Sequence, residues 1–263
     1  ASVDLWSLIR MSPSVHTFSV EGLSANLYMD EEGVGNWERI MPEADPDATE
    51  PAPEAPVEEE VALTDEEGEA ELISFNVQQV RIGNASVRFR DLQSGQDVSL
   101  TDTTLEARNI ALGHEFPLEL GFRVALSDPE FDLDGQLSML INASEDLQRF
   151  AVRDLDSEFN MSGEPFNGQS VTAGLSGALQ ANLAEETATL DELVATFENI
   201  RATTNLNLTG FNESPQLDGR FSVADFSAVQ LLEHLGQAPI ETDDGDVLKR
   251  ISLSTNITTD NGI

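Results

Sequence analysis

The side chains best suited to catalysis or metal binding in this sequence are three histidines and 49 carboxylates, and cysteine is absent. His16, His114 and His234 lie far apart, and no pair has the HxH or HxxxH spacing of a metal site. The acidic stretches DPEFDLDG (128–135) and ETDDGD (241–246) resemble calcium loops in composition, but neither has the twelve-residue ligand spacing that ends in Glu. Asp-Pro and Asp-Gly pairs are common in turns, so we interpret both stretches as turns.

Motifs for other kinds of catalysis are missing as well. The sequence has no GxSxG elbow, P-loop or Rossmann glycine pattern. Carboxylate pairs suited to glycoside hydrolysis arise by chance among 49 acids, and aromatic residues, which stack on sugars, make up only 6% of the chain. We therefore expect no enzyme activity, no cofactor and no bound metal.

Period-two alternation of apolar and polar residues is the dominant pattern, and it is typical of strands with one apolar and one hydrated face. PLELGFRVALSD (117–128) and EFDLDGQLSMLIN (130–142) both alternate, and the SDPE turn separates them. The pattern continues to residue 226, with Gly, Asn, Asp or Pro at most breaks. The alternation thus predicts a mainly β fold, an antiparallel meander of roughly a dozen strands with one hydrated face, together with one to three short helices.

The apolar positions of these strands are the candidate ligand-binding residues. They are chosen by alternation, so an error of one residue would turn a strand's set to the opposite face. The predicted groove consists of Leu118, Leu120, Phe122, Val124, Phe131, Leu133, Leu137, Met139, Ile141, Leu175, Leu179, Phe221 and Val223.

Four regions are expected along the chain. Residues 1–42 hold the first strands and a GNW sequence. Residues 43–71 form an acidic, disordered insertion with 13 acids and no base. Residues 72–226 form the sheet, and residues 227–263 hold a helix and the start of a further strand. The helix in DFSAVQLLEHLGQ has Asp225 or Ser227 as N-cap. Shorter helices are expected at 1–9 and at SEDLQRF (144–150). FSVEGLSANLYMDEEG (18–33) and FNVQQVRIGNASVRFRDLQSG (75–95) read as a weak repeat of neighbouring strands.

The formal charge of −36 argues against nucleic acid or an anionic membrane surface as a partner. It also suggests a saline habitat, in which a hydrated acidic surface maintains solubility. No run of about 18 apolar residues and no signal-peptide pattern is present, and the sequence reads as a soluble fragment of a longer protein.

The order of several motifs resembles the AsmA family of bacterial envelope proteins. In that family an alternating strand leads into a signature that this sequence matches at Asp30, Gly33, Gly35, Asn36 and Trp37. VQQVRIGNASVRFRDLQSGQDVSLTDTTLEARNI (77–110), LDGRFSVADFSAVQLLEHLGQAP (217–239) and DVLKRISLSTNIT (246–258) resemble later passages of the same family. We expect a structural role for the signature, in which the glycines allow a sharp exit and Trp37 plugs the end of the sheet. A contact of Trp37 with lipid at the groove mouth is the alternative.

The resemblance implies a periplasmic protein of a Gram-negative bacterium, anchored in the inner membrane by a segment absent here. It further implies a long, curved sheet that forms a half-pipe or taco-like groove, like that of chorein-like, bridge-type lipid-transfer proteins. The ligand that it implies is phospholipid or another acyl-chain lipid, with a role in outer-membrane assembly. The alternative is a structural or regulatory envelope scaffold, in which the apolar residues form the dry core of a closed β-sandwich and a protein partner binds outside.

Overall fold

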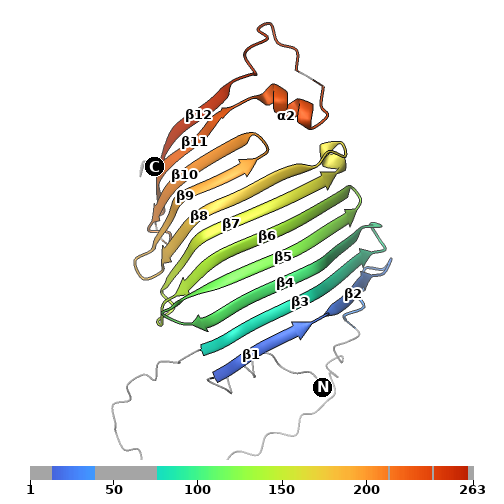
Figure 1. The fold of residues 1–263 in the computed structure, drawn as a ribbon, viewed down its shortest axis with the longest axis vertical. Helices are drawn as coiled ribbons and strands as arrows, with labels where there is room; N and C mark the ends of the chain where they lie inside the picture. Colours follow the sequence, from blue (N-terminus) through green and yellow to red (C-terminus); the bar gives the residue numbers. More distant parts are fainter. Residues whose placement is uncertain (1–13, 39–75, 213, 239, 260–263) are drawn as a thin grey trace, which may run out of the picture.

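The computed structural model describes residues 14–38, 76–212, 214–238 and 240–259, which form one open twelve-stranded sheet (Figure 1). Besides the strands, a 3-10 turn η1 (Glu164–Phe166) and one helix α2 (Ala228–His234) are present. The predicted fold class is therefore confirmed. The strands are β1 (Ser14–Glu21), β2 (Ser24–Met29), β3 (Asn76–Asp91), β4 (Asp97–Ala111), β5 (Glu115–Ser127), β6 (Glu130–Ala143), β7 (Arg149–Gly163), β8 (Val171–Asn182), β9 (Thr187–Phe197), β10 (Ile200–Thr209), β11 (Gln216–Phe226) and β12 (Ile251–Thr258).

From β3 to β12 the sheet is an antiparallel meander in which each strand pairs with the next one in the sequence. Most of the connections are short turns, as antiparallel neighbours allow. The pairing of β5 with β6 is regular over its whole length, from Glu115↔Asn142 to Ser127↔Glu130. The 117–128 and 130–142 stretches thus form the hairpin that their alternation predicts.

The two similar passages near the N-terminus lie side by side, as the sequence predicts, but they pair in parallel. β1 pairs with the first half of β3 and β2 with the second half, in one constant register from Ser14↔Asn76 to Met29↔Asp91. The prediction of antiparallel strands is wrong at this junction. Parallel neighbours need a long crossover, and the chain between β2 and β3 supplies it. Most of that crossover, including the acidic insertion 43–71, lies outside the described residues, as does the expected helix at 1–9.

The GNW signature folds back along the free edge of β2. The Asn36 side chain accepts a hydrogen bond from the Tyr28 N–H (3.0 Å) and donates one to the Asn26 carbonyl (3.0 Å), so it pairs with β2 as a neighbouring strand would. Asp30 holds the turn by accepting the Val34 N–H (2.9 Å), and Gly33 has a positive φ of 83°. These residues satisfy backbone groups that an edge strand otherwise leaves unpaired.

Gly35 and Trp37 form the second half of the signature. A Cβ added at Gly35 would lie 2.2 Å from the Trp37 ring. Gly35 is therefore needed because the ring packs closely against it. The expected role in backbone freedom is wrong for this glycine. Trp37 also packs against Phe89 of β3, with ring centroids 6.1 Å apart. The ring is half-buried, so it covers this corner of the sheet without being enclosed by it.

Asn36→Ala is expected to lower the free energy of unfolding by about 2 kcal/mol, because it removes two hydrogen bonds to the β2 backbone. Urea denaturation followed by circular dichroism would measure the change. Asn26→Ala is the matched control, because only the main-chain carbonyl of Asn26 takes part in this contact. Equal stability of the two variants would contradict the edge-pairing role.

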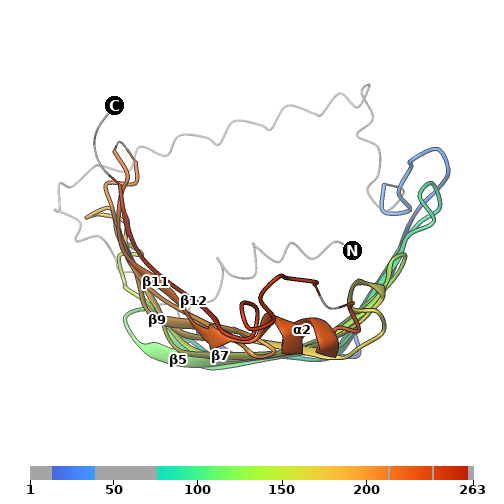
Figure 2. The same cartoon turned by 90° about the horizontal axis from the view of Figure 1, so that it is seen from above.

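The sheet bends along its strands into a half-pipe, seen end-on in Figure 2. The strand interiors contain register shifts, such as Thr101/Thr104 in β4 and Val152/Leu155 in β7. A residue with positive φ lies at each of these two, Asp102 (52°) and Asp154 (48°). Bulges of this kind bend a strand and increase its twist, which accounts for the curvature.

The helix expectations had mixed outcomes. Ser227, one of the two predicted caps, is the N-cap of α2. Its hydroxyl accepts a hydrogen bond from the Gln230 N–H (3.2 Å). The helix expected at 144–150 is wrong, because Ser144 instead accepts the Arg149 N–H (2.9 Å) across a tight turn and β7 begins at Arg149. No helix in the described part of the chain is long and apolar enough to cross a membrane.

Candidate functional site

One face of the sheet is apolar from edge to edge. Directly paired residues point to the same face of a sheet, so the register can be followed across it. One such row contains Ile82, Leu105, Leu120, Leu137, Ser157, Leu175, Ala195, Ala202, Val223 and Leu253. Nine of these ten side chains are apolar, and neighbouring rows repeat the pattern. We name this surface the apolar face.

The structure places all thirteen predicted groove residues on the apolar face. Within the β5–β6 hairpin, Leu118 lies opposite Met139, Leu120 opposite Leu137, and Val124 opposite Leu133. The Phe122 ring covers Gly135, where an added Cβ would be 2.6 Å from it. The other predicted residues occupy the same face through their pairing partners: Phe131, Ile141, Leu175, Leu179, Phe221 and Val223.

Two hydroxyl groups on the apolar face, those of Ser157 and Thr204, are turned back onto the backbone. The Ser157 hydroxyl donates to the Leu175 carbonyl and accepts the Leu175 N–H, both at 2.9 Å. Thr204, opposite Phe221, donates to the Arg220 carbonyl (3.1 Å). These polar atoms are satisfied within the sheet, so they offer a ligand little hydrogen bonding. The surface is suited to hydrocarbon and not to a polar substrate.

The apolar face is the concave one. Phe166 of η1 lies against Phe131 and Phe197, with ring centroids 6.3 Å and 6.4 Å apart, and both partners belong to the apolar face. The neighbouring Asn167 donates a hydrogen bond to the carbonyl of Leu235 at the end of α2 (3.0 Å). Figure 2 shows α2 on the inner side of the curve. The groove thus has an apolar floor, and the strand ends form its two rims.

No second layer covers this floor among the described residues. Only five apolar residues in that part of the chain are buried, namely Val77, Ala85, Ala107, Leu155 and Val171. The predicted groove residues all remain partly exposed. In a closed sandwich the inner side chains of two sheets interdigitate and bury one another. The described strands form an open sheet, with a large apolar area left facing solvent.

The convex face is polar and carries ion pairs. Arg123 lies between Asp102 and Asp134, with 2.9 Å from its guanidinium to each carboxylate. The hydrogen bond to Asp134 and the charges of both carboxylates raise the pKa of Arg123 above its usual value. A hydrogen bond from Arg88 lowers the pKa of Asp97. These pairs are solvent-exposed, so each contributes little to stability on its own.

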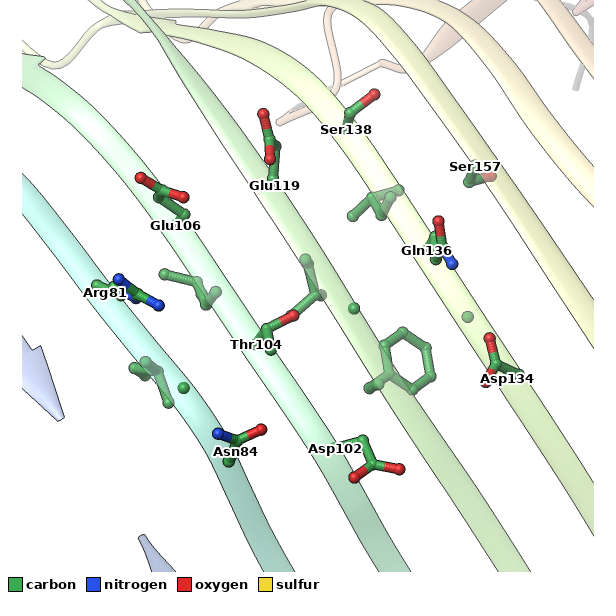
Figure 3. Close-up of a pocket in the computed structure, with 18 of the residues that line it drawn as sticks. Arg81, Asn84, Asp102, Thr104, Glu106, Glu119, Asp134, Gln136, Ser138 and Ser157 are labelled. Atoms are coloured by element: carbon green, nitrogen blue, oxygen red, sulfur yellow. The ribbon is translucent and has the colours of Figure 1, made fainter. Parts of the chain in front are cut away.

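A shallow depression of about 700 Å³ lies on the polar face across β3 to β7 (Figure 3). Gly83 of β3 and Gly121 of β5 belong to its lining at polar-face positions. Carboxylates dominate its lining, including Glu106, Glu119 and Asp134. The sequence did not lead us to predict this depression, and its only signal there is a glycine at a polar position of each of the two strands that flank β4.

Among the residues whose side chains the structure describes, those considered for metal binding do not converge. His114 lies at the β4–β5 turn and His234 on α2, where its ring is 3.3 Å from Glu198. Asp134 of the 128–135 stretch binds Arg123, and Asp246 of the 241–246 stretch binds Lys249 (2.7 Å). Within the described ranges, no group of three or more His, Asp or Glu side chains could hold a metal ion. The 241–246 stretch lies outside the strands, as its interpretation as a turn predicts. Of the 128–135 stretch, only 128–129 forms the turn, because 130–135 belongs to β6.

Added salt is expected to stabilise the protein. With a formal charge of −36, like-charge repulsion opposes the folded state, and raising the ionic strength from 0.01 M to 1 M shortens the Debye length from about 30 Å to about 3 Å. The melting temperature should rise by several degrees between these NaCl concentrations. A melting temperature that stays constant or falls would contradict both this view and the inferred saline habitat.

No protein-family model, curated protein or solved structure matched this chain.

Proposed function

We propose that this protein is an AsmA-like envelope protein whose concave apolar face carries the acyl chains of phospholipid during transport for outer-membrane assembly. The observation that supports the proposal most directly is the open apolar face, on which the Ser157 and Thr204 hydroxyl groups are satisfied by the backbone. Such a surface favours hydrocarbon and leaves headgroups at the rims in water.

The dimensions of the groove agree with this ligand. Eleven positions across the sheet, at about 4.8 Å between neighbours, give a floor roughly 50 Å long. A bilayer core about 30 Å thick contains two layers of acyl chains, so one chain spans about 15 Å. The floor could therefore hold more than one acyl chain along its length. We propose the periplasm as the site of action, with a membrane anchor outside this sequence.

Native mass spectrometry with organic extraction tests the proposal. The protein is purified without detergent from a bacterial host, and phospholipid is expected to co-purify at about one or more molecules per chain. A lipid-free, monodisperse and folded protein that also fails to take up lipid from vesicles would refute the carrier function. The envelope scaffold would then be the better explanation of the sheet.

A further inference from the structure

The two rims of the groove differ from its floor in that they are acidic. The first rim consists of the turns at 112–114, 144–148, 183–186 and 210–212, and the second of the turns at 92–96, 128–129, 164–170 and 198–199 together with α2. The first rim carries Glu145, Asp146, Glu185 and Glu186, and the second carries Asp128, Glu164 and Glu198. A headgroup that leaves the apolar floor must pass one of these rims.

Positive charge near the rims is scarce or already engaged. On the second rim, Arg88 and Arg90 both bind Asp97 of the facing strand. Near the first rim, Arg153 lies 3.5 Å from Glu115. Arg149, the first residue of β7, follows the 144–148 turn, which carries the carboxylates of Glu145 and Asp146. Arg201, beside the 198–199 turn, points to the polar face, because the next residue, Ala202, belongs to the apolar face. Few cations therefore face a phosphate that leaves the floor.

We propose that the acidic rims make the groove selective for lipids whose headgroup has no net negative charge, such as phosphatidylethanolamine, over anionic phosphatidylglycerol. This inference rests on the proposed function, because it concerns the headgroup of the lipid whose chains lie on the apolar face. The ammonium group of a zwitterionic lipid is attracted by the rim carboxylates, whereas a net anionic headgroup is repelled by them. Because the rim charges face water, the selectivity depends on ionic strength.

Binding of two lipids with identical fluorescent acyl chains, one phosphatidylethanolamine and one phosphatidylglycerol, tests the inference on the purified protein. At 20 mM salt we expect about tenfold tighter binding of the zwitterionic lipid, since several like charges within a Debye length of the headgroup add their effects. At 1 M salt the ratio should approach one. A ratio near one at low salt, or a ratio that salt does not change, would overturn the selectivity while leaving the lipid function in place.

Charge-reversal variants locate the effect. Glu145→Lys combined with Glu185→Lys should remove or invert the preference, because both side chains lie exposed on the first rim. Glu119→Lys makes the same kind of change on the polar face of β5 and should leave the preference intact. Equal effects of the rim and polar-face variants would overturn the role of the rims. If neither lipid binds at any salt concentration, the carrier function itself fails and the selectivity with it.

Discussion

Leu137→Asp combined with Phe122→Asp is expected to reduce lipid binding at least a hundredfold. Both side chains lie in the middle of the apolar face, on the adjacent strands β6 and β5. A carboxylate that must lose its water against an acyl chain, without a partner, costs several kcal/mol. Each 1.4 kcal/mol lost corresponds to a tenfold weaker affinity. Titration with a fluorescent acyl-chain lipid would measure the change.

The neighbouring position supplies the matched control. Ser138 follows Leu137 in the same strand and therefore points to the polar face, where it is exposed. Ser138→Asp adds the same charge less than 4 Å along the backbone and should leave lipid affinity unchanged. Circular dichroism on all variants distinguishes a loss of lipid binding from a loss of folding. The single variant Leu137→Asp replaces the double variant in the titration if the double variant is unstable. An equal fall in lipid affinity in Ser138→Asp would contradict the assignment of the apolar and polar faces.

Gly163→Ala is expected to destabilise the protein by about 4 kcal/mol. Gly163 ends β7 with φ 127° and ψ −167°, a region that only glycine adopts readily. An added Cβ would also lie 2.2 Å from the Glu130 carbonyl oxygen and 2.8 Å from the Phe131 Cα, both of which are backbone atoms that cannot move aside easily. Backbone strain of about 1 to 3 kcal/mol and this overlap add together. Chemical denaturation would give the value.

Two other glycines separate the causes of that loss. Gly168 has a positive φ of 74° but open space at its Cβ position, so Gly168→Ala should cost only about 1 kcal/mol. Gly245 has open space and no positive φ, and Gly245→Ala should be neutral. Equal stability of Gly163→Ala and Gly245→Ala would contradict the close approach of β7 to the β5–β6 turn.

Lipid uptake should weaken in Gly163→Ala, because Phe166 loses its position against Phe131.

The faces of the strands could be predicted from sequence because the side-chain period of a strand is two. In β5 the apolar residues from Leu118 to Val124 alternate without interruption, and the pairing with β6 has no irregularity to disturb it. The thirteen residues chosen in this way lie on one face. Whether lipid binds there stays a prediction.

Other features depend on information that is not local. The bulges that bend the sheet contain Asp102 and Asp154, whose sequence context is that of ordinary hydrated strand positions. Parallel pairing of β1 and β2 with β3 depends on where a long crossover returns, which alternation does not specify. The sequence at 144–150 predicts a helix and the structure has a turn, because Ser144 suits an N-cap as well as a tight turn and both use the same hydroxyl.

Because each strand from β4 to β12 pairs only with its neighbours in the sequence, this part of the sheet behaves as a one-dimensional chain of hairpins. In such a system stability is approximately a sum over units and their nearest interfaces. Folding can start at one hairpin and spread in both directions, without the long loop closures that slow most all-β proteins. An inserted hairpin would lengthen the floor by about 10 Å and disturb only the two strands beside it. Duplication or deletion of hairpins can therefore change the length of the groove stepwise.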